Sequence, residues 1–262
     1  MTPSLALSRS RSRTAVLDGL RRLLPKMEGF PAEMRALSFG HSALDSHLPQ
    51  GGLAFGALHE VAPEADGDMP AAFGFLAALL GRMPRDGPLL FVMSARSLAQ
   101  YGRPHGHGLN GLGLDPARMI LVETADERQT LWAIEEALRS AAPAAVAGTI
   151  ENLDLKTSQR LHLIAGDSGL PLLLLRPART REASAAATRW RVGAAEAARD
   201  RFGLIARWRW HLRLERCRNG RPGEWLVEFD HVAHRFSLAA TLADRALPLS
   251  AGGQPLMQAN RS

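Results

Sequence analysis

Hydrophobic and polar positions along the chain form three successive patterns, and the first covers residues 14–27. Apolar side chains recur there at the spacing of one helix face, which predicts an amphipathic helix. Two interpretations stay open, because such a helix either packs on its own domain or docks on a partner. The residues expected at a partner contact are Leu17, Leu20 and Leu24.

The second pattern, which ends near residue 175, alternates short apolar runs with helical stretches. Strands that alternate with helices predict an α/β fold, with a mostly parallel twisted sheet flanked by helices. The runs that predict buried strands are 88–93, 119–122, 144–150 and 171–175. The stretches that predict helices are 71–80, which is apolar nearly all round, and 127–139, which has one apolar face.

A capping signal marks the start of the second of these helices. Thr124 and Glu127 have the spacing of a capping box, in which two side chains satisfy the first free amides of a helix. We therefore expect this pair to begin the helix.

The third pattern alternates apolar and basic residues from 205 to 215, and again apolar and polar residues from 224 to 230 after the turn sequence RNGRPG. Alternation with period two predicts half-buried antiparallel strands that extend the sheet. The apolar set is Trp208, Trp210, Leu212, Leu214, Trp225, Val227 and Phe229, and the basic set is Arg207, Arg209, His211 and Arg213.

The basic row and the tryptophans do not form one nucleic-acid surface, because successive strand residues point to opposite faces of a sheet. Trp208 and Trp210 are therefore predicted to lie in the core. We expect the arginines to pair across the strands with Glu224 and Glu228. Such exposed ion pairs contribute about 0.2–1 kcal/mol each.

The composition indicates the size of the core, the charge of expected partners and the cellular location. The chain has 262 residues, of which 46% are hydrophobic, enough for one sizeable core. Its net charge of +6 favours acidic or phosphate-rich partners. The single cysteine, Cys217, cannot form an intrachain disulfide, and no apolar run reaches the roughly 18 residues that a membrane span needs. We expect a cytoplasmic protein without a signal peptide or membrane contact.

Three segments resemble the ATPase core of RecA. Residues 37–61 (LSFGHSALDSHLPQGGLAFGALHEV) are similar to the lead-in to its first core strand and phosphate loop. Residues 112–140 are similar to the stretch between its second and third core strands, and ARWRWHLRLERCRNGRPGEWLVEFD to the strands that end the core. Among RecA relatives, the degenerate loop, the TRWRV segment and the RNGRPGEW turn resemble the ImuA family of bacterial mutagenesis accessory proteins. The resemblance implies a RecA-like core over 37–240, between an N-terminal segment (1–36) and a C-terminal tail (241–262).

The phosphate loop decides between an enzyme and a non-enzyme. A Walker A loop, G-x-x-x-x-G-K-[ST], surrounds phosphates with backbone amides, while its lysine reaches the terminal groups and its hydroxyl holds magnesium. Here Asp68 replaces the lysine and Met69 the hydroxyl, and three carboxylates would repel a triphosphate. We therefore expect no nucleotide cofactor. The corresponding residues are Ala62, Pro63, Glu64, Ala65, Asp66, Gly67, Asp68 and Met69.

Two further differences from the RecA ATPase site also indicate a protein that does not hydrolyse ATP. Arg96 stands where RecA relatives carry the carboxylate that activates water, and Glu151 lies one residue beyond the place of the magnesium-binding Asp. A lone carboxylate cannot position magnesium without the missing lysine and hydroxyl. An active RecA-like ATPase remains an alternative. His105 and His107 lie in a Gly-rich loop without a third ligand, so we expect no metal site there.

The ImuA resemblance implies a role in the damage-induced (SOS) mutasome, which supports translesion DNA synthesis and mutagenesis. The partners that it implies are an ImuB-type relative of Y-family polymerases, a second DnaE-type polymerase subunit and RecA itself. The expected contact elements are the helix at 14–27 and the tail after residue 246. Three alternatives stay open: a single-stranded DNA-binding protein, a modulator of RecA filaments, and a SulA-like division inhibitor. The arginines expected to contact DNA are Arg179, Arg181, Arg189 and Arg191.

Overall fold

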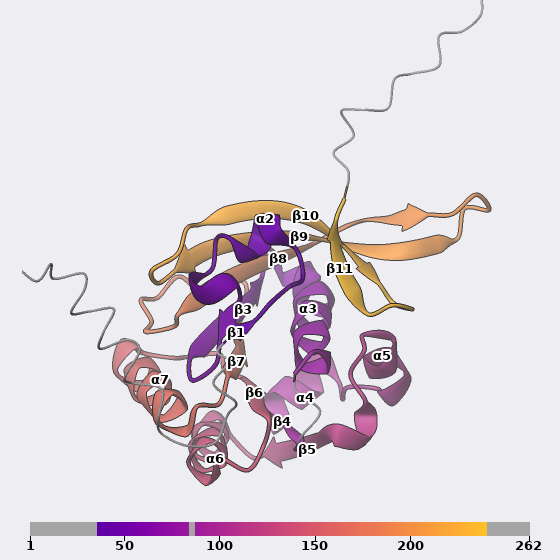
Figure 1. Cartoon of the computed structure of the whole chain (residues 1–262). Helices are drawn as coiled ribbons and strands as arrows, with labels where there is room; N and C mark the ends of the chain where they lie inside the picture. Colours follow the sequence, from indigo (N-terminus) through magenta and orange to yellow (C-terminus); the bar gives the residue numbers. More distant parts are fainter. Residues whose placement is uncertain (1–35, 84–86, 240–262) are drawn as a thin grey trace, which may run out of the picture.

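A computed structural model describes residues 36–83 and 87–239 of the chain (Figure 1). Its central feature is a nine-stranded sheet in the order β11-β10-β9-β8-β3-β7-β6-β4-β5. The expected helix at 14–27, with Leu17, Leu20 and Leu24, and the tail at 241–262 lie outside the described residues.

One half of the sheet is parallel. Its strands are β3 (Leu58–Pro63), β4 (Leu89–Ser94), β5 (Met119–Thr124), β6 (Ala145–Thr149) and β7 (Leu172–Leu175). Each strand pairs in parallel with its neighbours, and β3, β6 and β7 are buried along their whole length. Burial on both faces explains why β6 and β7 are continuous or nearly continuous apolar runs, whereas β3 also contains the buried polar residues His59 and Glu60. The four predicted strands are therefore confirmed, with ends that shift by one or two residues.

Helices cover both faces of this half (Figure 1). One face carries α3 (Met69–Gly81), and the other carries α6 (Glu127–Ser140) and α7 (Leu155–Ser168). Because the antiparallel strands wrap over α3, this helix is buried nearly all round, as its sequence predicts. The shorter helices are α2 (Ser42–Asp45), α4 (Ala95–Tyr101) and α5 (Gly106–Gly111). A small second sheet joins β1 (Ala36–Leu37) to β2 (Leu53–Ala54).

The predicted capping box of α6 is wrong, although the helix begins at Glu127 as its apolar face predicts. The N-cap is Asp126, whose carboxylate accepts a hydrogen bond from the Gln129 amide at 2.8 Å. Because β5 continues through Thr124, the N-cap comes two residues later than expected. Thr124 instead shares a 2.6 Å hydrogen bond with the Thr130 hydroxyl, and Glu127 accepts the amide of Asn152 at 2.8 Å.

The other half of the sheet is antiparallel, apart from the parallel pairing of β8 with β3. It contains β8 (Thr188–Arg199), β9 (Ile205–Cys217), β10 (Gly223–Asp230) and β11 (Arg235–Leu238). Trp210, Leu212 and Leu214 are buried and Trp208 packs against the same core, so the predicted inward face of this strand is confirmed. The α/β fold with a mostly parallel sheet and an antiparallel C-terminal extension is the arrangement of a RecA-like core.

The basic row on the opposite face of β9 pairs largely as expected. Arg207 and Arg209 both contact Glu228, at 3.0 and 2.6 Å. Arg213 lies opposite Glu224 in the strand register but reaches Glu64 instead, at 2.7 Å. His211 Nδ1 lies 3.8 Å from the Glu224 carboxylate, a contact that is an ion pair only when the histidine is protonated.

Candidate functional site

The loop in the place of the phosphate loop connects β3 to α3 at the carboxyl end of the parallel strands. Residues 62 and 63 still belong to β3, where they pair with β8, and a 3-10 turn (Asp66–Asp68) leads into α3. Glu64 continues the pairing, because its amide donates to the Val192 carbonyl at 2.9 Å. The sequence therefore places a strand, a short turn and a helix where a nucleotide-binding loop would need an open ring of amides.

The carboxylate of Asp68 occupies the amides of this loop. One oxygen accepts from the Ala65 amide at 3.1 Å, and the other accepts from the Ala194 amide of β8 at 3.0 Å. Glu64 accepts from Arg213 of β9 at 2.7 Å, which ties the loop to the antiparallel half. A carboxylate of the protein thus takes up an amide of the loop, a type of donor that a Walker A loop directs at its bound anion.

The charge of the loop also opposes a nucleotide. Glu64 and Asp66 are exposed and Asp68 is half-buried. A phosphate charge held about 5 Å from one of these carboxylates would be repelled by about 3 kcal/mol at an effective dielectric constant of about 20. The repulsion acts in addition to the loss of the lysine.

A second cluster lies at the ends of β4 and β6. The Glu151 carboxylate contacts Arg96 at 3.3 Å and Arg179 at 3.4 Å. Arg96 belongs to α4, which directly follows β4, so a cation stands in the place expected for the water-activating carboxylate. Two guanidinium groups counter the charge of Glu151 and compete with any magnesium ion for its oxygens.

An apolar pocket of 570 Å³ separates the acidic loop from the segment after α4. Its walls include Met69, Phe73 and Leu175, and Asp66 and Tyr101 also line it. Burial, followed by the carboxylates of Glu151 and Asp66, raises the pKa of the Tyr101 hydroxyl. The hydroxyl therefore stays protonated at neutral pH, and the pocket suits an apolar group rather than phosphates.

The four arginines expected to contact DNA separate into two pairs. Arg179 and Arg181 are exposed on the connection between β7 and β8, although Arg181 also donates to the Ala178 and Thr180 carbonyls at 2.9 and 2.8 Å. Arg189 and Arg191 are buried, in contrast to the expectation. A buried guanidinium group cannot reach a phosphate without a rearrangement, so only the first pair remains available.

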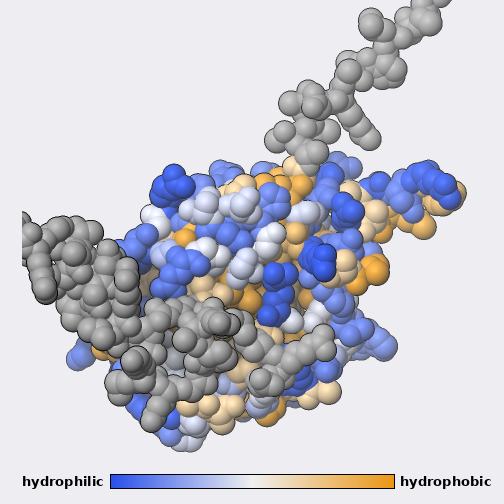
Figure 2. Space-filling model, in the orientation of Figure 1, coloured by the Kyte–Doolittle hydropathy of each residue, from blue (hydrophilic) through white to orange (hydrophobic). Residues whose placement is uncertain are grey.

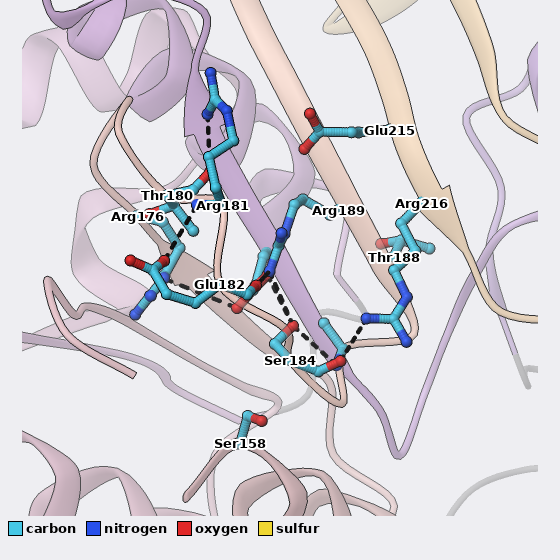
Figure 3. A network of polar contacts seen from close by, with 12 residues as sticks. Ser158, Arg176, Thr180, Arg181, Glu182, Ser184, Thr188, Arg189, Glu215 and Arg216 are labelled. Atoms are coloured by element: carbon cyan, nitrogen blue, oxygen red, sulfur yellow. Dashed lines mark hydrogen bonds and ion pairs between the residues drawn. The ribbon is translucent and has the colours of Figure 1, made fainter. Parts of the chain in front are cut away.

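The buried pair holds the connection against the sheet, and Figure 3 shows Arg189 beside Glu182 and Ser184. Arg189 donates to Glu60 at 2.7 Å, to the Glu182 carbonyl at 2.7 Å and to Ser184 at 3.2 Å. Arg191 donates to the Ala178 carbonyl at 2.6 Å and to the Thr180 carbonyl. Both arginines are therefore structural in this conformation, because their donors are used within the chain.

Glu60 is the residue that sequence reasoning missed. It is fully buried in β3, between Arg189 at 2.7 Å and Arg176 at 3.8 Å. A charged residue inside an otherwise apolar strand was the available signal, because buried carboxylates are nearly always paired.

Of the two histidines considered for metal binding, His105 is the N-cap of α5 and His107 lies within this helix rather than in the expected loop. His105 and His107 are exposed, with ring centroids 5.5 Å apart. Within residues 36–83 and 87–239, no group of three or more His, Cys, Asp or Glu side chains could hold a metal ion. Over the same residues, no helix combines the length and apolar character that a bilayer crossing requires.

Comparison with known proteins identifies the family. Two curated relatives, both named Protein ImuA, come from Caulobacter vibrioides strains NA1000 / CB15N and ATCC 19089 / CIP 103742 / CB 15. Each is 35% identical to this chain over 238 residues, which cover 83% of the chain and 94% of the relative. The chain belongs to the ImuA family. The ImuA resemblance of the degenerate loop, the TRWRV segment and the RNGRPGEW turn is thus confirmed.

A scan against models of protein families finds no match for this ImuA-family chain. The assignment therefore depends on the curated relatives, which match nearly their whole length. The RecA-like core that the resemblance implied is the fold observed, and its phosphate loop differs from a Walker A loop in both sequence and hydrogen bonding.

Proposed function

We propose that this ImuA-family chain is a non-catalytic accessory protein of the SOS-induced mutasome. In this role it supports translesion DNA synthesis and damage-induced mutagenesis through protein contacts. The observation that carries the proposal is the Asp68 carboxylate, which stands in place of the Walker A lysine and accepts hydrogen bonds from the Ala65 amide of the loop and the Ala194 amide of β8. The Arg96–Glu151–Arg179 cluster supports it, because the expected catalytic and magnesium positions are occupied by an ion-paired group.

Calorimetry of the purified full chain with magnesium-ATP tests the absence of a nucleotide site. We expect no saturable heat at millimolar nucleotide, and no magnesium-dependent phosphate release. A Glu151→Ala variant serves as the control for any residual hydrolysis, because a contaminating ATPase would be unaffected by it. Micromolar binding of magnesium-ATP that depends on residues 62–69 would overturn the proposal.

The partners proposed are the ImuB-type polymerase relative, the second DnaE-type polymerase subunit and RecA. The contact elements proposed are the N-terminal segment, around Leu17, Leu20 and Leu24, and the C-terminal tail. Affinity capture of each partner by the full chain is compared with capture by chains that lack residues 1–36 or 241–262. Loss of capture supports the assignment, and full retention by both truncated chains removes it.

Direct binding of single-stranded DNA is a second candidate function. Arg179 and Arg181 favour it, because both are exposed and near each other on the connection that leads into β8. Phosphate contacts make the affinity fall with salt by a slope of about 0.7 per contact on a single strand. Anisotropy of a labelled oligonucleotide should therefore show weaker binding and a smaller slope for Arg179→Glu with Arg181→Glu.

The exposed Arg128 of α6 and Lys156 of α7 supply a matched control, because Arg128→Glu with Lys156→Glu changes the net charge by the same amount on the two helices. Equal losses for the two double variants would indicate nonspecific attraction. Unchanged affinity of the paired variant would remove these two arginines as DNA contacts.

A further inference from the structure

The arginines of β9 and of the turn that follows it fall into two groups. Arg207, Arg209 and Arg213 contact carboxylates. Arg216 and Arg218 are exposed, and neither forms an ion pair with a carboxylate of the described residues. Figure 2 shows mainly hydrophilic surface at this end of β9 and β10, opposite to the hairpin of β8 and β9. Two positive charges are therefore left uncompensated at this end of the sheet.

The two unpaired guanidinium groups are neighbours. Arg216 donates to the Ser184 carbonyl at 2.5 Å (Figure 3), and Arg218 donates to the Ala185 carbonyl at 3.4 Å. Because Ser184 and Ala185 are consecutive residues of the connection between β7 and β8, both cations lie over the same part of this connection. A guanidinium group has five N–H donors, so most donors of both groups have no acceptor within the described residues.

Two donors also face His162, a half-buried residue of α7. The Leu58 amide donates to Nδ1 at 3.3 Å, and Arg218 Nη1 lies 3.3 Å from Nε2. A neutral imidazole has one nitrogen that accepts and one that donates, whereas an amide N–H and a guanidinium group only donate. One of the two contacts therefore brings two donors together, whichever nitrogen carries the proton.

The conflict falls on the side of Arg218. The Leu58 amide is fixed at the start of β3, whereas Arg218 is an exposed side chain, so Nδ1 is the accepting nitrogen. Burial, followed by the charge of Arg218, lowers the pKa of His162, which keeps the ring neutral at pH 7. The proton on Nε2 then points towards a guanidinium group. An acceptor shared by these two donors would satisfy both.

Charge favours an anion over water as this acceptor. Arg218 is the only charged side chain of the described residues that shifts the pKa of His162, so no carboxylate offsets the field there. A water molecule would leave the charges of Arg216 and Arg218 uncompensated. A phosphate group with one ester bond or none carries about −1.5 to −2 charges at pH 7, which matches two guanidinium groups. It also offers three terminal oxygens, and arginine binds such oxygens strongly.

We propose that His162, Arg216 and Arg218 bind a terminal phosphate group between α7 and the end of β9. One phosphate oxygen accepts from His162 Nε2 and from Arg218, and another accepts from Arg216. The same chemistry is offered by inorganic phosphate and by the 5′-phosphate of a nucleic-acid strand. The proposal is independent of the mutasome assignment and of the DNA contacts proposed for Arg179 and Arg181.

Nuclear magnetic resonance of the imidazole nitrogens in the full chain tests the donor pattern. A His162→Gln chain assigns the signals, and in the absence of phosphate we expect the neutral ring to carry its proton on Nε2. Sodium phosphate added at constant ionic strength should shift these signals to saturation and raise the pKa of His162, because a bound anion stabilises the imidazolium form. A proton on Nδ1, or signals that do not respond to phosphate because water satisfies the donors, overturns the proposal.

Single variants test the two arginines. Arg218→Gln and Arg216→Gln each remove a charge-assisted hydrogen bond, which should weaken the binding of phosphate about tenfold. Arg128→Gln of α6 is the matched control, because it removes the same charge from another exposed arginine and should leave the affinity unchanged. Circular dichroism checks that all three chains are folded. Equal weakening by Arg128→Gln and Arg218→Gln would indicate nonspecific attraction and overturn the site.

Fluorescence anisotropy distinguishes the two sources of the phosphate. Single-stranded oligonucleotides labelled at the 3′ end carry either a 5′-phosphate or a 5′-hydroxyl group. If the ligand is the strand end, the 5′-phosphate tightens binding to the wild type, and Arg218→Gln removes this difference while the contribution of Arg179 and Arg181 stays. Equal binding of both oligonucleotides, with a saturable response to sodium phosphate, assigns the site to free phosphate. Equal binding without such a response overturns the proposal.

Discussion

His59 shows how strongly one buried polar residue can depend on its neighbours. It is buried in β3, where Nε2 donates to the Ala54 carbonyl at 2.8 Å and Nδ1 accepts from the Thr188 hydroxyl at 2.8 Å. The Trp190 indole donates to the same hydroxyl at 3.0 Å. Because a carbonyl can only accept, the Ala54 contact places a proton on Nε2, and in the neutral imidazole Nδ1 then accepts from the Thr188 hydroxyl.

Acid should therefore destabilise the protein through His59. Burial lowers the pKa of His59 from 6.5 to about 4, against the opposing effect of the Ala54 hydrogen bond. Between these values the unfolded chain binds the proton and the folded chain does not, so stability is complete above about pH 6.5, falls towards pH 4 and then levels off. The full contribution is about 3 kcal/mol, of which about 2 kcal/mol is lost between pH 7 and pH 5.

Urea unfolding at pH 7 and pH 5 measures this loss, and His59→Gln is the comparison, because an amide can keep both hydrogen bonds without titrating. The variant should lose about 2 kcal/mol less than the wild type over this range. An equal loss in both proteins would show that other groups cause the acid sensitivity.

Glu60 and Glu123 offer a direct comparison between a buried and an exposed ion pair. Each carboxylate lies 2.7 Å from an arginine nitrogen, Glu60 from Arg189 inside the protein and Glu123 from Arg103 at the surface. Glu60→Gln leaves a buried guanidinium group without its counter-charge, which should cost about 3–5 kcal/mol of unfolding free energy. Glu123→Gln should cost less than about 1 kcal/mol. Similar costs for the two variants, measured by urea unfolding, would contradict the structural role of Glu60.

At the scale of elements, the N-cap of α6 is Asp126, whereas the sequence pattern predicted Thr124. Asp126 accepts the Gln129 amide, so Asp126→Ala should lower the unfolding free energy by about 1 kcal/mol. The control Glu136→Ala changes an exposed residue in the same helix and should stay within about 0.5 kcal/mol. Thermal unfolding compares the two, and an Asp126→Ala chain as stable as the control would contradict the cap.

The elements that the sequence predicted well are those whose pattern is local. The parallel strands β4, β6 and β7 are nearly continuous apolar runs, and β9 and β10 alternate apolar and polar residues, so the local sequence indicates which side chains are buried. The patterns predicted no strand at β8, whose second half reads Ala-Ala-Glu-Ala-Ala-Arg, a composition that favours helix. Pairing with β9 overrides this local preference.

In the candidate site, too, features that depend on neighbouring residues in the sequence were predicted, and features that depend on distant residues were not. The acidic loop was predictable, because the positions that define a phosphate loop are consecutive residues. The burial of Arg189 and Arg191 was not, because their partners include Glu60 and Glu215, which lie far away in the sequence. Only the pairing of β3, β8 and β9 brings these charges together.

At the scale of the whole molecule, the changes from a nucleotide-binding core are spread over several elements that now support one another. Asp68 links the loop to β8, Glu64 links it to β9, and Glu151 links α4 to the connection after β7 through Arg96 and Arg179. Residues at the positions of a nucleotide site thus hold the two halves of the sheet together. Restoring a nucleotide-site residue at one of these positions would therefore break contacts on which the other positions depend.

Restoring the loop alone should not restore an ATPase. Asp68→Lys with Met69→Thr recreates the Walker A cation and hydroxyl, but Arg96 still stands in the place of the activating carboxylate. The same change leaves the Ala65 and Ala194 amides without their acceptor, at an expected cost of about 1–3 kcal/mol in unfolding free energy. Phosphate release should stay at the wild-type background, while hydrogen exchange at the Ala194 amide becomes faster. Magnesium-dependent turnover by this two-residue variant would show that the rest of the core had kept its catalytic arrangement, and that the loop alone had silenced it.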